Sequence, residues 1–130
     1  MFVYVDSINK RQEKLAFDII LHCYKELIDG YEVDVLVNIK SNLDDNTDGW
    51  CQRISTTDYE IEIKRNLNDE CFIKTLCHEM VHVKQGVKGE LANGATWRGK
   101  TYSNEQPWEV EAYRLEKELF NSFCKKGKKP

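Results

Sequence analysis

Residues 69–85 have the periodicity of an amphipathic helix, and this feature constrains the fold most, because one side of that helix needs a core to pack against. Asn66 or Asn68 is suited to cap the start of the helix, and Gly86 is suited to end it. At 100° per residue, the apolar side chains fall on one side: Ile73, Leu76, Cys77, Met80, Val83 and Val87.

The opposite side of this helix carries two of the three histidines, His78 and His82, four residues apart. Residues at i and i+4 share a helix face, so both imidazoles can be presented to one metal ion. Glu79 lies between the histidines and the buried side, within reach of a water on that ion without being a ligand itself. The H-E-x-x-H pattern therefore predicts a zinc site with Glu79 as its general base.

Residues 7–29 form an earlier predicted helix, capped by Ser7 or Asp6 and ended by Gly30. Its apolar stripe is expected to consist of Ile8, Leu15, Ile19, Cys23 and Leu27. His22 lies on the same helix. A lone helical histidine is expected at the surface or as a hydrogen-bonded core residue, not as a metal ligand.

Three strands are predicted between the two helices. Residues 31–40 alternate cleanly between apolar and polar side chains, and the segments 50–55 and 59–65 follow. Within the intervening loop, residues 44–49 match the first half of a calcium-binding loop. Ser55 stands where the closing glutamate is required, so an ordinary turn is the favoured interpretation.

A glycine-rich stretch, residues 86–106, leads to a last helix that begins at Pro107. We expect this stretch to be ordered and to form a wall of the metal cleft, with a hairpin that turns at Arg98 and Gly99. Arg98 and Tyr102 are its candidates for stabilising a developing oxyanion. The buried stripe of the last helix is predicted to be Trp108, Ala112, Leu115, Leu119 and Phe123.

A catalytic zinc needs three protein ligands and one open position, so the histidine pair is incomplete. No histidine follows His82, and Gln85 and Lys88 stand where a metzincin has a glycine and a third histidine. The third ligand is therefore expected to be a carboxylate from the last helix. Glu109 and Glu111 flank the buried stripe of that helix on either side, and helical geometry leaves both open.

H-E-x-x-H followed by a helical glutamate resembles the gluzincins, whose third ligand tends to lie in an E-x-x-A pattern. Residues 109–112, Glu-Val-Glu-Ala, match this pattern, so the resemblance implies Glu109 as the third ligand. It also places Tyr113 where many gluzincins have an aspartate or asparagine that orients a ligand histidine, which implies a supporting hydrogen bond from Tyr113.

Residues 49–85 also resemble the SprT-like metallopeptidase domains in their glycine-led strand pair, capped helix and H-E-M-x-H. The segments "TWRGK" and "PWEVEA" are similar to small phage-encoded proteins of this kind. The resemblance adds nucleic acid as a weakly supported partner, because SprT-like domains work on DNA-bound proteins.

A net charge of −3 gives no general attraction to nucleic acid or anionic membranes, and no apolar run approaches the ~20 residues that cross a bilayer. The N-terminus lacks the order of a signal peptide, and the five cysteines contain no C-x-x-C pair. We therefore expect a cytoplasmic protein with reduced thiols and with Cys77 in the core.

Together these features predict an α+β, zincin-like domain over residues 1–124, followed by a basic tail at residues 125–130. The expected activity is zinc-dependent hydrolysis of peptide bonds in a peptide or protein substrate, with the metal-bound water activated by Glu79. The alternative is a zinc-stabilised binding module, associated with peptides or DNA, that lacks general proteolytic activity.

Overall fold

The computed structural model describes residues 1–43, 46–93 and 95–126 as three helices and two sheets, a mixed α and β fold as expected. In chain order the elements are β1 (Phe2–Asp6), α1 (Lys10–Leu27), β2 (Asp34–Lys40), β3 (Gly49–Arg53), β4 (Asp58–Lys64), α2 (Asp69–Val87), β5 (Leu91–Ala92), β6 (Thr96–Trp97), β7 (Lys100–Thr101) and α3 (Pro107–Lys125). Among these described residues, no helix has the length and apolar character needed to span a bilayer.

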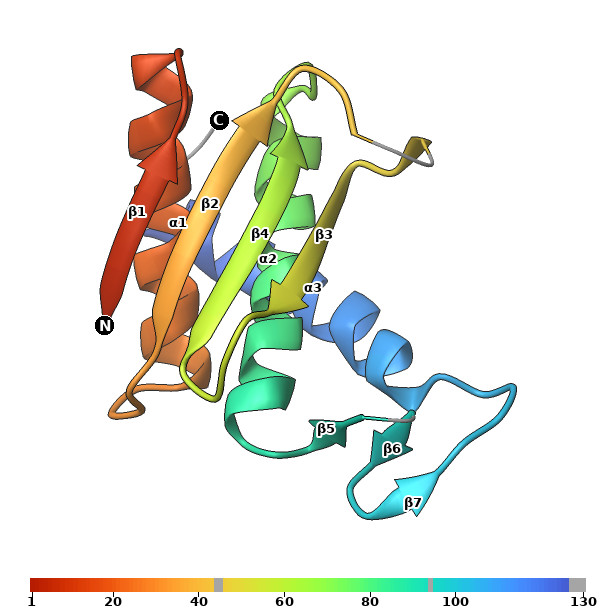
Figure 1. The fold of residues 1–130 in the computed structure, drawn as a ribbon. Helices are drawn as coiled ribbons and strands as arrows, with labels where there is room; N and C mark the ends of the chain where they lie inside the picture. The colour runs from red at the N-terminus through yellow and green to blue at the C-terminus, as the bar shows by residue number, and fades with distance from the viewer. Residues whose placement is uncertain (44–45, 94, 127–130) are drawn as a thin grey trace.

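The larger sheet has four strands in the order β1-β2-β4-β3, one more than the three strands that were predicted (Figure 1). β1, β2 and β4 are parallel, and β3 runs antiparallel to β4 at one edge. β1 was not predicted from the sequence, because Phe2 and Tyr4 are apolar but lie exposed on the outer face, while Val5 faces the core. Without alternation in polarity, the segment lacked the pattern of a half-buried strand.

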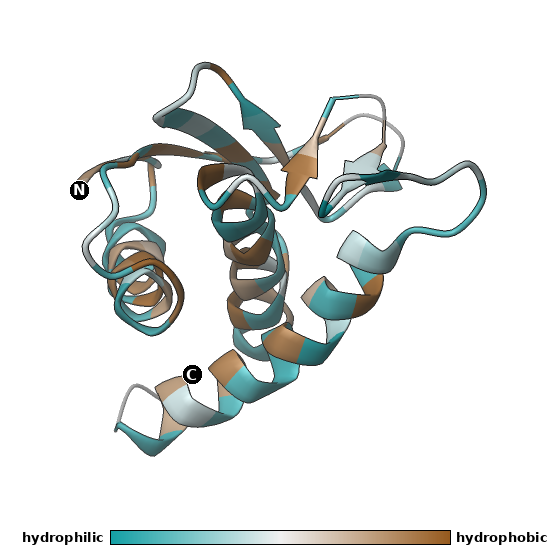
Figure 2. Ribbon diagram, turned by 90° about the horizontal axis from the view of Figure 1, so that it is seen from below, coloured by the Kyte–Doolittle hydropathy of each residue, from teal (hydrophilic) through white to brown (hydrophobic). Residues whose placement is uncertain are grey.

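All three helices lie on the same side of this sheet (Figure 2). α1 and α2 pack against the strands, and α3 crosses α2 on the side away from the sheet. The core between sheet and helices is formed by aliphatic residues of β2 and β4 and by one face of each helix. α2 is therefore the central element, covered by the sheet on one side and by α3 on the other.

α1 begins later than predicted. Asn9 is its N-cap, and the side-chain oxygen of Asn9 accepts a hydrogen bond from the backbone N–H of Gln12 at 3.1 Å. The predicted caps, Ser7 and Asp6, and the first predicted stripe residue therefore lie outside the helix. Ile8 is 84% exposed because it precedes the first turn.

α2 is capped by Asn68, one of the two predicted residues, through a 2.8 Å hydrogen bond from the backbone N–H of Cys71. The predicted apolar side is confirmed as core, except that Val87 is only partly buried. Lys84 and Gln85 are buried against Glu111 of α3, on a side that was expected to be open. In all, five residues of α2 beyond the predicted set are buried: Phe72, Glu79, Val81, Lys84 and Gln85.

Gly86 does not end α2, contrary to the prediction, since the helix continues to Val87. Glycine is needed there for a different reason. The ring of Tyr59 from β4 lies so close to Gly86 that a Cβ atom at this position would overlap the Tyr59 hydroxyl. Gly89, which follows the helix with a φ of 71°, has the left-handed conformation typical of a helix end.

The described residues of the glycine-rich stretch include three short strands, β5, β6 and β7. β6 and β7 pair antiparallel and are joined by Arg98 and Gly99, whose φ angles are 49° and 85°. Positive φ at both central residues is the geometry of a tight hairpin turn, so the predicted turn is confirmed. α3 then begins at Pro107, also as predicted, and extends to Lys125.

We predict that Gly86→Ala lowers the stability of the protein. In an ordinary helix interior, the same substitution of glycine by alanine raises the free energy of unfolding by about 1 kcal/mol. Here the new methyl group must displace the Tyr59 ring, and such overpacking costs about 1–3 kcal/mol. Chemical denaturation would measure the free energy of unfolding. A stabilised Gly86→Ala protein would contradict the close contact between α2 and Tyr59.

Candidate metal centre

The crossing of α2 and α3 brings together two imidazoles and one carboxylate. His78 and His82 lie one turn apart on α2, with ring centroids 4.9 Å apart, and Glu109 approaches from the first turn of α3. Glu109 Oε1 lies 2.9 Å from His78 Nε2 and 3.2 Å from His82 Nε2. The three residues can present ligand atoms that all lie within 4.8 Å of one another, so they form a candidate metal centre.

Each histidine is also held through its other ring nitrogen. His78 Nδ1 lies 2.7 Å from Glu116 Oε1, and His82 Nδ1 lies 2.8 Å from Gln85 Oε1. Sequence reasoning missed both partners. Glu116 follows Glu109 by seven residues, which is two helical turns, and Gln85 follows His82 by three. These same-face spacings were signals that could have identified them.

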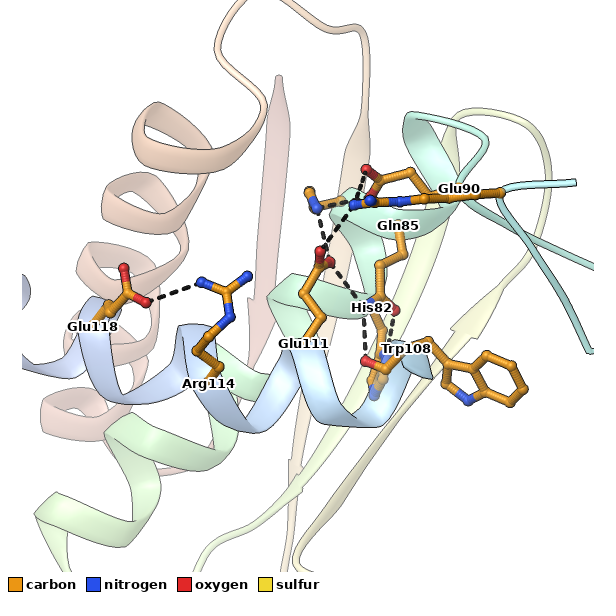
Figure 3. Close-up of polar contacts among 9 residues, drawn as sticks. His82, Gln85, Glu90, Trp108, Glu111, Arg114 and Glu118 are labelled. Carbon is orange, nitrogen blue, oxygen red and sulfur yellow. Dashed lines mark hydrogen bonds and ion pairs between the residues drawn. The ribbon is translucent and has the colours of Figure 1, made fainter. Parts of the chain in front are cut away.

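The hydrogen bonds of Gln85 determine the protonation of His82. Its amide nitrogen donates to the carbonyl oxygen of Trp108 at 2.8 Å and to Glu111 at 3.1 Å, so its oxygen faces His82 (Figure 3). An amide oxygen only accepts, and His82 must therefore donate from Nδ1. The lone pair of a neutral His82 then lies on Nε2, the nitrogen that a metal would bind.

A proton or a cation is required between Glu109 and the two imidazoles. With both Nδ1 atoms donating to oxygens, neutral histidines would direct Nε2 lone pairs at the Glu109 carboxylate. Two ligands that are each about 2.05 Å from a zinc ion at the tetrahedral angle lie about 3.3 Å apart. The two separations, 2.9 and 3.2 Å, are close to that value, and all three ligand atoms lie within 4.8 Å of one another, so these residues could hold a metal ion.

In the absence of metal, protons hold the same cluster together. Burial lowers the pKa of His78, but hydrogen bonds to Glu109 and Glu116 outweigh this effect and raise it to about 8. The pKa of His82 is also raised, since the hydrogen bonds to Glu109 and Gln85 outweigh burial. The two histidines hold the pKa of Glu109 well below its usual range. Glu109 is therefore ionised and available as a ligand.

Glu79 lies beside the ligands without contacting them through a hydrogen bond. Its side chain is 6% exposed, and across the described residues it forms no hydrogen bond or ion pair. Burial raises its pKa, although the neighbouring histidines oppose this. It lines the same cavity as His78 and His82, so its carboxylate is free to interact with a molecule that enters.

This cavity has a volume of about 600 Å³ and lies between α2, α3 and the edge strand β3. β3 contributes Gly49, Trp50 and Cys51 to the lining, and α3 contributes Tyr113. The Tyr113 ring lies beside His78, with centroids 4.7 Å apart, and is largely exposed. Both ring nitrogens of His78 are already paired with carboxylates of α3, which accept the hydrogen bonds, so Tyr113 contacts the centre through its ring.

Arg98 and Tyr102, the predicted oxyanion-stabilising residues, do not line this cavity. The Arg98 guanidinium lies over the Trp97 ring and pairs with Glu90 and Glu111, each at 3.3 Å. Tyr102 packs edge-on against Trp108. The glycine-rich stretch approaches the ligands through residues 91–93 instead, which line a hollow together with His82 and Glu109.

Glu111, the other candidate for the third ligand, belongs to a separate buried network. Its carboxylate accepts hydrogen bonds from Lys84 at 2.7 Å, from Gln85 and from Arg98 (Figure 3). Lys84 also pairs with Glu90 at 2.7 Å. These contacts join α2, α3 and the hairpin region, and they leave Glu109 as the carboxylate that faces the Nε2 atoms of both histidines.

The remaining predicted features are His22, the calcium-like pattern, the basic tail and Cys77. His22 is a satisfied core residue, as favoured from the sequence, with Nε2 2.8 Å from the Ser122 hydroxyl. Asp44, the first residue of the calcium-like pattern, lies outside the described residues, as do residues 127–130 of the basic tail. Cys77 is buried in the core, with its sulfur 3.7 Å from that of Cys23.

Comparison with known proteins identifies no relative, since no family model, no curated protein and no solved structure matches the chain. The functional argument therefore rests on the geometry of the centre.

We predict that Glu109→Ala loses bound zinc during dialysis, whereas Glu111→Gln retains it. Glu109 is the carboxylate that contacts both Nε2 atoms, and Glu111 is occupied by Lys84 and Arg98. Metal content per chain, measured by mass spectrometry after dialysis, tests the assignment. Loss of zinc from Glu111→Gln but not from Glu109→Ala would reverse it.

Glu111→Gln should instead lower stability by about 2 kcal/mol at neutral pH, the scale of a hydrogen bond to a charged group. Burial raises the pKa of Glu111, but bonds from Lys84 and Gln85 outweigh this and lower it overall. The ionised form therefore stabilises the fold above the unfolded pKa of about 4.3, and this contribution is lost as the pH falls.

Glu118→Gln is the matched control, because Glu118 is 63% exposed and its one ion pair in the described structure is with Arg114, one turn away on α3 (Figure 3). This substitution should change the free energy of unfolding by less than about 0.5 kcal/mol. Urea denaturation at pH 7 and pH 3.5 compares both variants with the native protein. Equal effects of the two substitutions at pH 7 would show that the buried network contributes no more than a surface pair.

Proposed function

We propose that this protein is a zinc-dependent metallopeptidase that hydrolyses peptide bonds. One observation carries the proposal: two imidazoles and a carboxylate converge on one point, while a buried carboxylate that has no partner among the described residues faces the same cavity. Three ligands with an adjacent acid or base are the arrangement of a catalytic rather than a structural zinc site, because a structural site is closed by a fourth protein ligand.

His78, His82 and Glu109 would hold the metal through two nitrogens and one oxygen. When bound, zinc acts as a Lewis acid toward a carbonyl oxygen and lowers the pKa of a coordinated water to about 7. Glu116 and Gln85 keep the two imidazoles in the orientation that directs Nε2 at the ion. Such supporting hydrogen bonds also make the ligand nitrogens more basic.

Glu79 would act as the general base and then as the general acid. Its pKa is raised by burial, which brings it nearer to neutral pH, where proton transfer to and from a carboxylate is most effective. It would accept a proton from water and return that proton to the amine that leaves. Glu79 has no hydrogen-bond partner among the described residues, which supports this role, because an existing hydrogen bond would have to break before Glu79 could accept a proton from water.

An extended substrate would bind along β3. Within the described part of the chain this strand pairs with β4 alone, so its other edge can pair with a peptide backbone. Residues 49–51 of the same strand line the cavity over the ligands. Strand addition would therefore carry a scissile bond past the metal centre and Glu79.

We predict that Glu79→Gln keeps the fold and the bound zinc but lowers peptidase activity by at least ~100-fold, the lower end of what a positioned general base contributes. Glutamine matches glutamate in size but cannot accept a proton at neutral pH. The assay needs a peptide library in which cleavage by the native protein is first established.

Equal cleavage by the native protein and Glu79→Gln would refute the mechanism. A native protein that binds zinc and peptides but cleaves no member of the library would favour a zinc-stabilised binding module instead. Thermal melting and zinc content of both proteins serve as controls for folding and metal loading.

A further inference from the structure

The cavity over the metal ligands continues into a second hollow of about 350 Å³ on the side of Arg53. The two hollows share Cys51, His82 and Glu109, so a peptide that lies along β3 would pass from one to the other. The walls of the second hollow include the side chains of Leu91 and Trp108. It therefore lies where a substrate side chain beside the scissile bond would be placed.

Tyr59 forms part of this hollow and has an unsatisfied hydroxyl. The residue is 3% exposed, and its Oη atom has no hydrogen-bond partner in the part of the chain that the structure describes. The hydroxyl lies against Gly86 of α2, which also lines the hollow, so it points to the cleft side of the sheet. A buried donor without a partner is unfavourable unless a ligand or a water completes it.

Arg53 provides a second donor at the same place. It is the cross-strand neighbour of Tyr59, and among the described residues it is the one lysine or arginine that lines either hollow. Its Nε donates to the carbonyl oxygen of Ser55 at 3.1 Å, which leaves the two terminal nitrogens able to bind another group. With Glu109 committed to the metal, this end of the cleft carries a positive charge.

We infer that this hollow, the Tyr59 subsite, binds a substrate side chain that ends in an oxygen acceptor, namely glutamine or glutamate. This inference rests on the proposed function. Leu91 and Trp108 offer apolar contacts to the methylene groups of such a side chain, and Tyr59 and Arg53 offer donors to its terminal oxygens. A methionine side chain is similar in length to glutamine but has no oxygen acceptor, and a lysine side chain would be repelled by the positive charge of Arg53.

The test uses extended alanine-based peptides that each contain one variable residue: glutamine, glutamate, methionine or lysine. The variable residue is placed at each position of the peptide in turn. Fluorescence anisotropy measures their binding to zinc-loaded Glu79→Gln protein, which does not turn them over. At one position, the glutamine and glutamate peptides should bind about tenfold more tightly than the methionine peptide.

In the same background, Tyr59→Phe should reduce this preference to within about twofold, because it removes the hydroxyl alone. Arg53→Met should weaken the glutamate peptide more than the glutamine peptide, which separates the contribution of charge from that of hydrogen bonding. Tyr4→Phe, on the exposed outer face of β1, is the matched control and should change nothing.

A melting temperature for Tyr59→Phe that is equal to or above that of the parent is also expected, because an unpartnered hydroxyl gives the fold nothing. Methionine peptides that bind as tightly as glutamine peptides, an unchanged preference in Tyr59→Phe, or no peptide binding at all would each overturn the inference. Cleavage by the native protein is scored separately, so binding with the expected preference but without cleavage would refute only the peptidase proposal.

Discussion

The packing of α3 across α2 is the contact on which the candidate centre depends. Two of the three potential ligands come from α2 and the third from α3, so the centre exists only while the two helices keep their relative position. Apolar residues such as Ala112 and Phe123 bury one face of α3, and the network around Glu111 fixes its N-terminal end. An apolar contact alone tolerates sliding, whereas directional bonds at one end define the register.

The supports of the two histidines differ in charge, and the difference follows from their surroundings. His78 is supported by a carboxylate from Glu116, and His82 by the neutral amide of Gln85. A glutamate at position 85 would face the carboxylate of Glu111, which the fold already uses to hold Lys84 and Arg98. An amide can accept from one neighbour and donate to the other, so Gln85 connects the histidine to the buried network without adding a charge.

The sequence was informative about much of the local helix geometry, although the start of α1 was predicted too early. The spacing of His78 and His82, the cap at Asn68 and the start of α3 at Pro107 all follow from local rules, and they are observed. Predictions were wrong where an element packs against something distant. Gly86 was assigned to a helix end because its contact with Tyr59 of β4 is not visible in the sequence. Arg98 was assigned to the cleft because its attraction to Glu111 depends on the fold.

The placement of one Glu109 oxygen between two imidazole nitrogens has a consequence for how the centre would be filled. Both nitrogens require a positive partner, and before any ion arrives that partner is hydrogen. Metal uptake is then an exchange in which protons leave as the ion enters, because a protonated nitrogen has no lone pair to donate. Metal occupancy of the cluster would therefore depend on pH. In acidic solution, the metal ion would compete with the protons that hold the same three side chains together.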